Sequence, residues 1–392
     1  MSKEREFDLV LYGATGFTGR LVAEHLVRQY GDDPDLQWAM AGRSEEKLAA
    51  VRDEIGAPQN TPLLVADASD PVSLRSMAER TRLVLTTVGP YQLYGSDLVA
   101  VCAETGTDYV DLCGEPIWMR QMIDAHEETA ADSGARIVFS CGFDSIPFDM
   151  GVYFLQQTAK KQFGATAPRV KGRVRTMKGG FSGGTAASFR ATLAAAQNNP
   201  SVLALLRDSF ALTPGFSGPE QPRGNKPAYD ETMDVWCAPF IMAPINTRNV
   251  HRSNALLGHA YGEEFVYDEM LVAGPGEEGE AKAKAIAKAD ALGGDNAPRP
   301  GEGPSKEERE AGSYDVLFIG EMPDGSEVRA SVAGDLDPGY GSTSRMITEA
   351  ALCLLRDAAD TPGGIWTTAP AMGEKLIRRL VDNAGLRFTV ET

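Results

Sequence analysis

The stretch LYGATGFTGR, residues 11–20, follows a short apolar run and precedes a segment with helical periodicity. Its glycines at 13, 16 and 19 form the spacing GxxGxxG. Gly13 allows a tight turn and Gly19 allows the next helix to pack closely, because neither residue carries a side chain. The pattern therefore predicts a turn that leads the chain from a buried strand into a helix.

The same order of strand and helix recurs over the first 145 residues. Strands are predicted over residues 7–13, 36–44, 61–69, 82–90, 107–115 and 135–143. Helices are predicted over residues 20–30, 45–55, 71–80, 95–105 and 117–133. This alternation is typical of an α/β protein, and the simplest arrangement is a Rossmann-type, doubly wound parallel sheet.

Within that arrangement the glycine turn is a candidate dinucleotide site. Gly16 lets the backbone approach a pyrophosphate, while the helix start offers free N–H groups and the positive end of its dipole. The alternative is a packing turn without a ligand, and the placement between strand and helix favours the dinucleotide. The predicted cofactor contacts in this turn are Gly13, Thr15, Gly16, Phe17, Thr18 and Gly19.

The end of the second strand favours NADP over NAD. An Asp or Glu is usual there in NAD-binding chains, but this chain reads AGRS at residues 41–44. Arg43 and Ser44 offer a guanidinium and a hydroxyl, which suit a ribose 2′-phosphate. The alternative is an arginine on a solvated turn. Asp67, at the end of the third strand, is expected either to face the adenine edge or to cap the helix over 71–80.

The loop after the fourth strand is predicted to line the cofactor cleft, as loops at the carboxyl ends of parallel strands do. It contains VGPYQLYG, and we expect Gly89, Pro90 and Tyr91 beside the cofactor. Tyr91 and Tyr94 are candidate proton donors. The alternative is that both are packing aromatics with satisfied hydroxyls.

Two further candidate catalytic residues, Asp144 and Ser145, follow the last predicted strand. The first domain would end and the second begin at this point, which places both residues at the cleft. The alternative role for Asp144 is a cap on the next helix.

The second half of the chain contains two patterns that indicate a binding site less specifically. Residues 170–196 read as strand, glycine-rich turn and helix, in which Gly183, Gly184, Thr185 and Ser188 offer donors to a carbonyl or phosphate. A tight turn without a ligand is the alternative. The basic cluster of Arg248, His251 and Arg252 is suited to a phosphate or an acidic carrier protein, or else is a surface cluster paired with carboxylates.

Composition narrows the class of protein. The chain has 392 residues, 43% of them hydrophobic, and a formal net charge of −17. An acidic balance disfavours nucleic-acid binding. Five cysteines without a CxxC pair argue against a disulfide framework and a metal site. We find no apolar run that would form a signal peptide or a membrane span, so a cytoplasmic location is expected.

Longer blocks of the chain resemble the saccharopine dehydrogenase-like oxidoreductases. The blocks are TTVGPYQLYG (86–95), YVDLCGEP (109–116), CGFDSIPFDMG (141–151), KGGFSGGTAAS (178–188), FIMAPINTRNVHRSNALL (240–257), DPGYGSTS (337–344) and PAMGEKLIRRL (370–380). Within that family the chain looks most like the mycobacterial trans-acting enoyl reductases, and the similarity covers nearly its whole length.

The resemblance implies an NADP-binding Rossmann domain over residues 1–145 and a second α/β (α+β) domain over 146–345. The second domain would carry the substrate face and a contact between two subunits of a homodimer. Residues 346–392 would form C-terminal helices that pack back on the first domain.

One segment departs from the relatives, which have a longer apolar stretch at this place. Residues 274–312 are instead rich in charge, Ala, Gly and Pro, which is typical of a solvated linker or lid with one short helix over 281–291. The apolar stretch of the relatives implies a peripheral membrane contact, which this composition disfavours.

Three functions follow from these observations. The first is an NADPH-dependent enoyl reductase that acts on a small-molecule or carrier-linked acyl substrate. The second is an imine or amino-acid oxidoreductase like saccharopine dehydrogenase, which would need charged groups to hold a dicarboxylate. The third is a non-catalytic NADP-binding scaffold of a lipid pathway.

Overall fold

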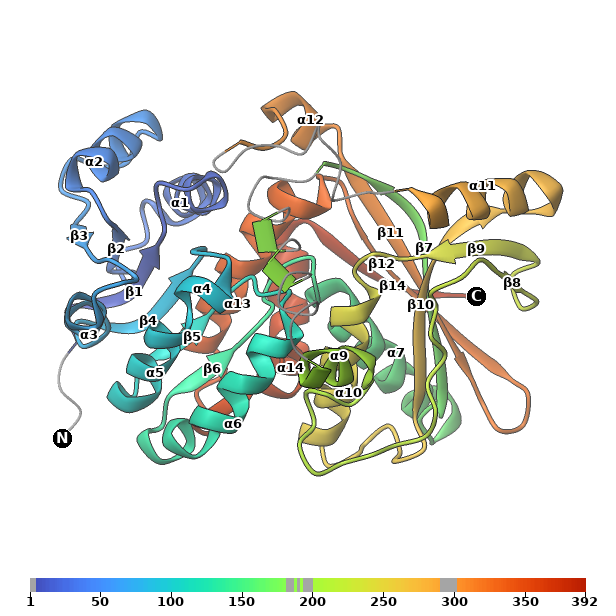
Figure 1. Cartoon of the computed structure of the whole chain (residues 1–392). Helices are drawn as coiled ribbons and strands as arrows, with labels where there is room; N and C mark the ends of the chain where they lie inside the picture. The colour runs from blue at the N-terminus through green and yellow to red at the C-terminus, as the bar shows by residue number, and fades with distance from the viewer. Residues whose placement is uncertain (1–4, 181–186, 189–190, 193–199, 290–301) are drawn as a thin grey trace.

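The computed structural model describes residues 5–180, 187–188, 191–192, 200–289 and 302–392. Two seven-stranded sheets stand side by side, and α7 (Ile146–Phe163) and α10 (Ala243–Leu256) lie in the layer between them (Figure 1). The predicted fold class, a doubly wound parallel sheet with a second mixed α/β unit, is confirmed.

The first sheet is parallel throughout. Its strands in spatial order are β13 (Gly364–Trp366), β6 (Arg136–Val138), β5 (Asp108–Val110), β4 (Thr81–Thr86), β1 (Phe7–Tyr12), β2 (Trp38–Gly42) and β3 (Leu63–Val65). Its first helices are α1 (Phe17–Tyr30), α2 (Glu45–Glu54), α3 (Pro71–Ala78), α4 (Tyr91–Tyr94), α5 (Ser96–Thr105) and α6 (Pro116–Ser133). Each predicted strand forms, and sequence patterning missed only the seventh, β13.

Alternation along β1 explains why both faces of this sheet are covered. Leu9 and Leu11 point into a core shared with α1, α2 and α13 (Thr343–Arg356). Val10 and Tyr12 point into a second core shared with α3, α5 and α6. Because successive strand residues face opposite sides, an unbroken apolar run buries both faces of the sheet.

The second sheet is mixed, and only the pair β7–β10 is parallel. Its order is β14 (Leu386–Glu391), β12 (Glu327–Gly334), β11 (Ser313–Glu321), β7 (Arg169–Lys178), β10 (Val266–Gly274), β9 (Val235–Pro239) and β8 (Ala228–Asp230). The remaining helices are α9 (Pro200–Arg207), α11 (Gly276–Lys288), α12 (Lys306–Glu310) and α14 (Thr368–Arg379), with π-helical turns at Pro338–Ser342 and Leu380–Ala384. The short helix predicted over 281–291 thus forms as α11, slightly earlier in the chain.

The end of the chain contributes to both sheets. β13 pairs with β6 in the first sheet, and β14 pairs with β12 in the second. Between them, α14 packs against α7 and α13. One continuous hydrophobic core includes Leu11 of the first sheet, Phe318 of the second and Ile347 of α13, so the two sheets share an interior.

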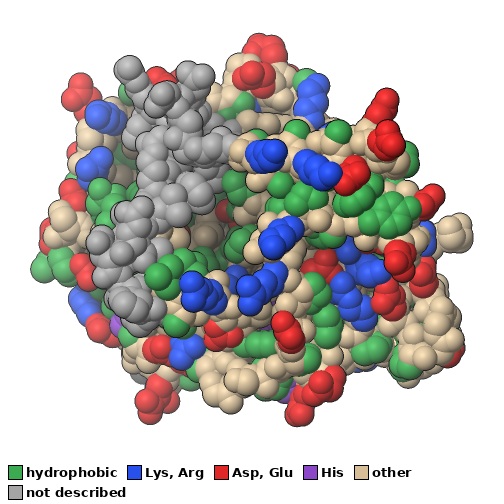
Figure 2. Space-filling view, turned by 45° about the vertical axis from the view of Figure 1, so that its right-hand side comes forward, with side chains coloured by type: hydrophobic (Ala, Val, Ile, Leu, Met, Phe, Trp, Pro, Cys, Tyr) green, Lys and Arg blue, Asp and Glu red, His purple; other side chains and the backbone are tan. Residues whose placement is uncertain are grey.

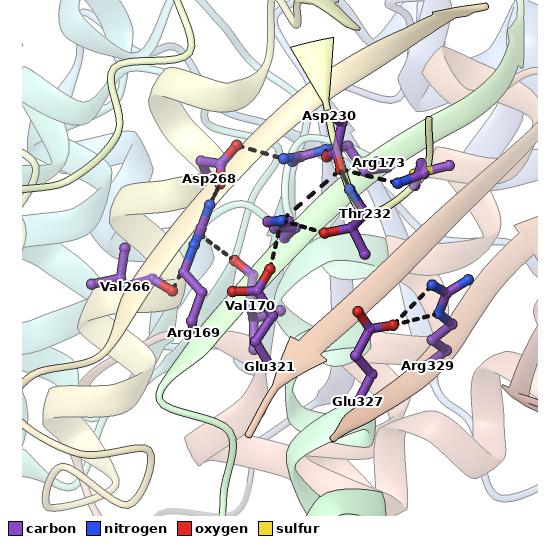
Figure 3. Close-up of polar contacts among 12 residues, drawn as sticks. Arg169, Val170, Arg173, Asp230, Thr232, Val266, Asp268, Glu321, Glu327 and Arg329 are labelled. Atoms are coloured by element: carbon purple, nitrogen blue, oxygen red, sulfur yellow. Dashed lines mark hydrogen bonds and ion pairs between the residues drawn. The ribbon is translucent and has the colours of Figure 1, made fainter. Parts of the chain in front are cut away.

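Ion pairs cover the face of β7 that alternates with its core residues Val170 and Val174 (Figure 3). Arg173 lies between two carboxylates: Nε is 2.6 Å from Asp230 Oδ2 and Nη1 is 2.9 Å from Asp268 Oδ2. Lys171 pairs with Glu321 beside them. These side chains are satisfied by one another, which is typical of a structural network.

Charges of both signs are interspersed over the face seen in Figure 2, with hydrophobic side chains between them. No helix in the described part of the chain has the length and apolarity needed to cross a membrane. All five cysteines are buried as free thiols.

Candidate active site

The glycine turn has the geometry that its spacing predicts. Gly13 adopts φ +94°, a conformation that favours glycine, and its N–H donates to the carbonyl of Ala41 at 2.9 Å. A Cβ on Gly19 would lie 2.1 Å from the oxygen of Gly13, so α1 can approach the turn only because residue 19 has no side chain. The backbone is thereby folded tightly under the start of α1.

Gly16 differs from Gly13 and Gly19 because it faces outward. It is the exposed N-cap of α1, and among the described residues a Cβ there would meet only the Gly13 oxygen, at 3.3 Å. The first turn of α1, which contains Phe17 and Thr18, has no acidic residue. This open surface of N–H groups at a positive dipole end fits a pyrophosphate. Thr15 lies nearby, 3.8 Å from the position of a Cβ on Gly42.

Arg43 and Ser44 take different roles at the end of β2. Arg43 is exposed, and its guanidinium has no hydrogen bond or ion pair with a described residue. It is therefore free to meet a 2′-phosphate. The Ser44 hydroxyl accepts a hydrogen bond from the N–H of Lys47 at 3.3 Å and caps α2.

Asp67 lies near Arg43, and hydrogen bonds from Ser69 together with the Arg43 charge lower its pKa. Its carboxylate accepts from the N–H and the hydroxyl of Ser69, at 2.9 and 2.7 Å. The alternative that Asp67 caps the next helix is wrong, because Asp70 caps α3 through the N–H of Val72 at 3.0 Å.

Tyr91 is not placed to act as a proton donor. Its side chain is 5% exposed, and its hydroxyl accepts a hydrogen bond from Leu112 N at 3.0 Å and donates to Thr86 O at 3.4 Å. Burial raises the pKa of Tyr91 well above its usual value. These contacts favour the alternative of a packing aromatic with a satisfied hydroxyl. A Cβ on Gly89 would lie 3.5 Å from Cε2 of the Tyr91 ring. Pro90 is the N-cap of α4.

A buried acidic loop that the sequence patterns did not single out supports Tyr91. Glu115, 3% exposed, accepts hydrogen bonds from the N–H groups of Tyr91 and Gln92, both at 2.9 Å. Asp111 is fully buried and accepts from Tyr109, Cys113 and Ser140. The block YVDLCGEP contains both acids, but the capping role emerges only when β4 and β5 stand side by side.

Asp144 has the properties of a general acid. It is half-buried in the loop between β6 and α7, and its Oδ2 would lie 3.2 Å from a Cβ on Gly114. The carboxylate has no hydrogen bond or ion pair with any described residue, and burial raises its pKa to about 7. Asp144 does not cap α7, whose N-cap is Ser145. Gly114 lies next to the Glu115 cap, so Asp144 and α4 face the same loop.

Ser145 positions Asp144, and it is not itself placed to contact a substrate. It is 2% exposed, its hydroxyl donates to the carbonyl of Asp144, and it accepts from Asn249 Nδ2 at 2.5 Å. Among the described residues, no three His, Cys, Asp or Glu side chains gather into a metal site.

Of the predicted substrate residues, Gly184 and Thr185 lie outside the described residues. Ser188 is half-buried, and its carbonyl accepts from Thr192 Oγ1 at 3.0 Å. The Thr192 hydroxyl in turn lies 3.4 Å from Gln92 Nε2. Ser188 thus belongs to a segment that meets α4.

The basic cluster on α10 is buried, so the expectation of a surface cluster is wrong. Arg248 is 6% exposed and donates to the carbonyls of Pro244 and Leu206, while burial and the Arg248 charge lower the pKa of His251 to about 3. Arg252, 4% exposed, donates to the carbonyls of Leu212 and Ile365 and pairs with Glu127 at 2.9 Å. Arg252 thereby joins α10 to α6 and to β13 of the first sheet, whereas Arg248 contacts only Pro244 and Leu206.

Comparison with known proteins agrees with this geometry. Residues 9–138 match the family model of the saccharopine dehydrogenase NADP-binding domain. The fold is similar to that of saccharopine dehydrogenase (L-Glu forming) from Saccharomyces cerevisiae, with TM-score 0.55 and 12% identity over 98% of this chain and all of that one. Homospermidine synthase from Legionella pneumophila, solved with NAD, gives TM-score 0.57 and 10% identity over 100% and 93% of the two chains. The fold and the nucleotide turn define an NADP-dependent oxidoreductase of the saccharopine dehydrogenase type.

Sequence relatives narrow the family further. A Mycobacterium tuberculosis protein, named provisionally as a trans-acting enoyl reductase, is 44% identical over 404 residues, 96% of each chain. The trans-acting enoyl reductase of Mycobacterium ulcerans is 38% identical over 408 residues, 97% of this chain and 96% of its own. The chain belongs to the trans-acting enoyl reductase family, as its sequence blocks predicted.

Proposed function

We propose that this chain reduces a carbon–carbon double bond of a thioester-linked acyl chain with NADPH. The names of its relatives support the reaction class. The observation that carries the proposal is Asp144, at the carboxyl end of the first sheet. Its carboxyl group has no partner in the described part of the chain and a pKa of about 7. Such a group holds a proton at neutral pH and can release it.

Reduction of an enoyl thioester needs a hydride at the β-carbon and a proton at the α-carbon. NADPH supplies the hydride when it is bound. Gly13, Gly16 and the start of α1 would bind its pyrophosphate, and Arg43 its 2′-phosphate. Asp144 would supply the proton, while Ser145 and Asn249 fix the backbone that carries it. The proposal needs no covalent intermediate.

An exposed apolar pair on α4 supports an acyl substrate. Leu93 is 61% exposed and Tyr94 48% exposed, although both follow the buried Tyr91. Both residues lie on α4, whose first N–H groups donate to Glu115. Asp144 faces Gly114, next to Glu115. A long acyl chain that passes over α4 would cover this surface and contribute about 25 cal/mol for each Å² removed from water.

The imine oxidoreductase alternative would need cations that are free to hold a dicarboxylate. Arg248 and Arg252, the arginines of the basic cluster, are buried and bonded to backbone carbonyls. They are therefore unavailable, which favours the enoyl substrate.

The test follows NADPH absorbance with short- and long-chain enoyl thioesters, a ketoacyl thioester, and an α-keto acid with an amine. We expect oxidation with the enoyl thioesters, faster for the long chain. Leu93→Asp should reduce the preference for the long chain, whereas Val72→Asp, at a 77% exposed position on α3, should not. Oxidation only with the keto acid and amine would favour the imine reaction. Binding of NADPH without turnover of any substrate would favour a scaffold.

A further inference from the structure

The charged segment after residue 301 reaches across to the nucleotide turn. A Cβ on Gly303 would lie 2.5 Å from Phe17 Cε1, and the Arg309 guanidinium carbon lies 5.6 Å from the centre of the Phe17 ring. Tyr340 packs edge-on against the same ring, with centroids 5.2 Å apart. Phe17 is the first residue of α1, so residues 303–309 bring part of the second domain to the start of that helix.

Local contacts hold Arg309 in place. Ser305 and Glu308 form a capping box at the start of α12. Arg309 Nη1 donates to the carbonyl of Pro304 at 2.7 Å, and the carbonyl of Arg309 accepts from Asp337 N at 2.9 Å. The guanidinium makes no other hydrogen bond to a described residue, so its remaining N–H groups are available as donors.

Two carboxylates, Asp337 and Glu307, interact electrostatically with Arg309. Phe17 begins the positive end of the α1 dipole, whose first turn has no acidic residue. The two Asp337 oxygens accept from the N–H groups of Tyr340 and Gly341, at 2.9 and 2.8 Å, and neither carboxylate forms an ion pair with Arg309 in the described part of the chain. A guanidinium beside a helix N-terminus is a repulsive arrangement that an anion bound between them reverses.

We propose that Arg309 is a cofactor-binding residue that contacts the pyrophosphate of NADPH from the second domain, with the Phe17 ring as its platform. The glycine turn would bind the pyrophosphate from one side and Arg309 from the other. The proposal rests on NADP binding and not on the substrate, so it stands even if enoyl reduction fails.

Arg309→Ala tests the proposal by equilibrium binding of NADPH and NADH, which share the pyrophosphate. We expect the Kd of both to rise by the same factor, about tenfold, as for loss of one charge-assisted hydrogen bond. Arg43→Ala should weaken NADPH alone. Adenosine 2′-monophosphate has no pyrophosphate. It should bind equally tightly to wild type and Arg309→Ala, but more weakly to Arg43→Ala.

The matched control is Lys306→Ala on the same short helix, where the side chain is 73% exposed and pairs with Glu310 at 3.8 Å. It removes the same charge and should leave each Kd unchanged. Arg309→Lys should recover part of the affinity. Equal Kd values for wild type and Arg309→Ala, or a loss confined to NADPH, would overturn the proposal. Thermal unfolding without cofactor separates this effect from simple loss of packing on Phe17.

Discussion

Asn249 on α10 donates from Nδ2 to Ser145 Oγ at 2.5 Å, and the Ser145 hydroxyl donates in turn to the backbone carbonyl of Asp144. α10 thereby fixes the loop between β6 and α7. Asn249 is 1% exposed and Ser145 2% exposed, so the link is shielded from water. It positions the Asp144 carboxyl group without using it as a hydrogen-bond partner.

Asp144→Asn should lower turnover about a hundredfold, because the amide cannot give up a proton. In wild type, kcat/KM should fall as the pH rises through about 7, since the raised pKa of Asp144 leaves the acid protonated below that point and ionised above it. The variant should lose this dependence while its Kd for NADPH stays unchanged. Asp324→Asn, in the exposed turn between β11 and β12, is the control for the change of charge. An unaltered pH profile in Asp144→Asn would exclude it as the acid.

Tyr91→Phe should change turnover by less than about tenfold, since the hydroxyl lies between Thr86 O and Leu112 N and not at a substrate. It should lower the free energy of unfolding by about 1–3 kcal/mol, because the Leu112 N–H loses its buried acceptor. Urea titration measures the second effect and steady-state kinetics the first. A hundredfold loss of turnover with unchanged stability would restore Tyr91 as a proton donor.

The glycines at 16 and 19 should respond in opposite ways. Gly16 has φ −76° and ψ 167°, and a Cβ there meets only one atom, at 3.3 Å, so Gly16→Val should fold. Its side chain should abolish binding of both NADPH and NADH by filling the pyrophosphate position. Gly19→Ala places a Cβ 2.1 Å from the Gly13 oxygen and should destabilise the fold. Wild-type cofactor affinity in folded Gly16→Val would contradict the assignment of the turn.

Arg252→Ala should lower the free energy of unfolding by about 3 kcal/mol or more, because buried carbonyls of Leu212 and Ile365 lose their donor. Arg329→Ala removes a solvated guanidinium paired with Glu327 (Figure 3). This variant should change the free energy of unfolding by less than about 0.5 kcal/mol. Chemical unfolding of both variants makes the comparison. Similar small effects would mean that the Arg252 contacts with β13 and α6 contribute little to stability.

Local patterns in the sequence were sufficient for the βα units and the glycine turn. Each unit combines an apolar run, a turn and a helical period within a few residues. Gly13 has the positive φ that a tight turn requires, and Gly19 allows the close approach of α1. The edge strand β13 escaped prediction because its three residues pair with β6 more than 200 positions earlier, at a range where local periodicity carries no information.

The candidate site shows the same limit. The positions of Asp144 and Arg43 follow from strand ends, which the sequence indicates. The roles of Tyr91 and Arg252 depend on which distant carbonyl or N–H group completes their hydrogen bonds. A charged or aromatic side chain looks the same in sequence whether it faces a ligand or satisfies a buried backbone group, and tertiary contacts alone separate the two.

The return of the chain end to both sheets has a consequence for synthesis. A ribosome releases the nucleotide-binding half first, yet β6 lacks its neighbour β13 until residues 364–366 emerge, and β12 waits longer still for β14. Until those residues emerge, β6 and β12 each present an unpaired strand edge, the kind of surface that recruits other chains. Once the last strands have formed, β13 and β14 replace β6 and β12 as edge strands, so the strands exposed during translation become interior ones.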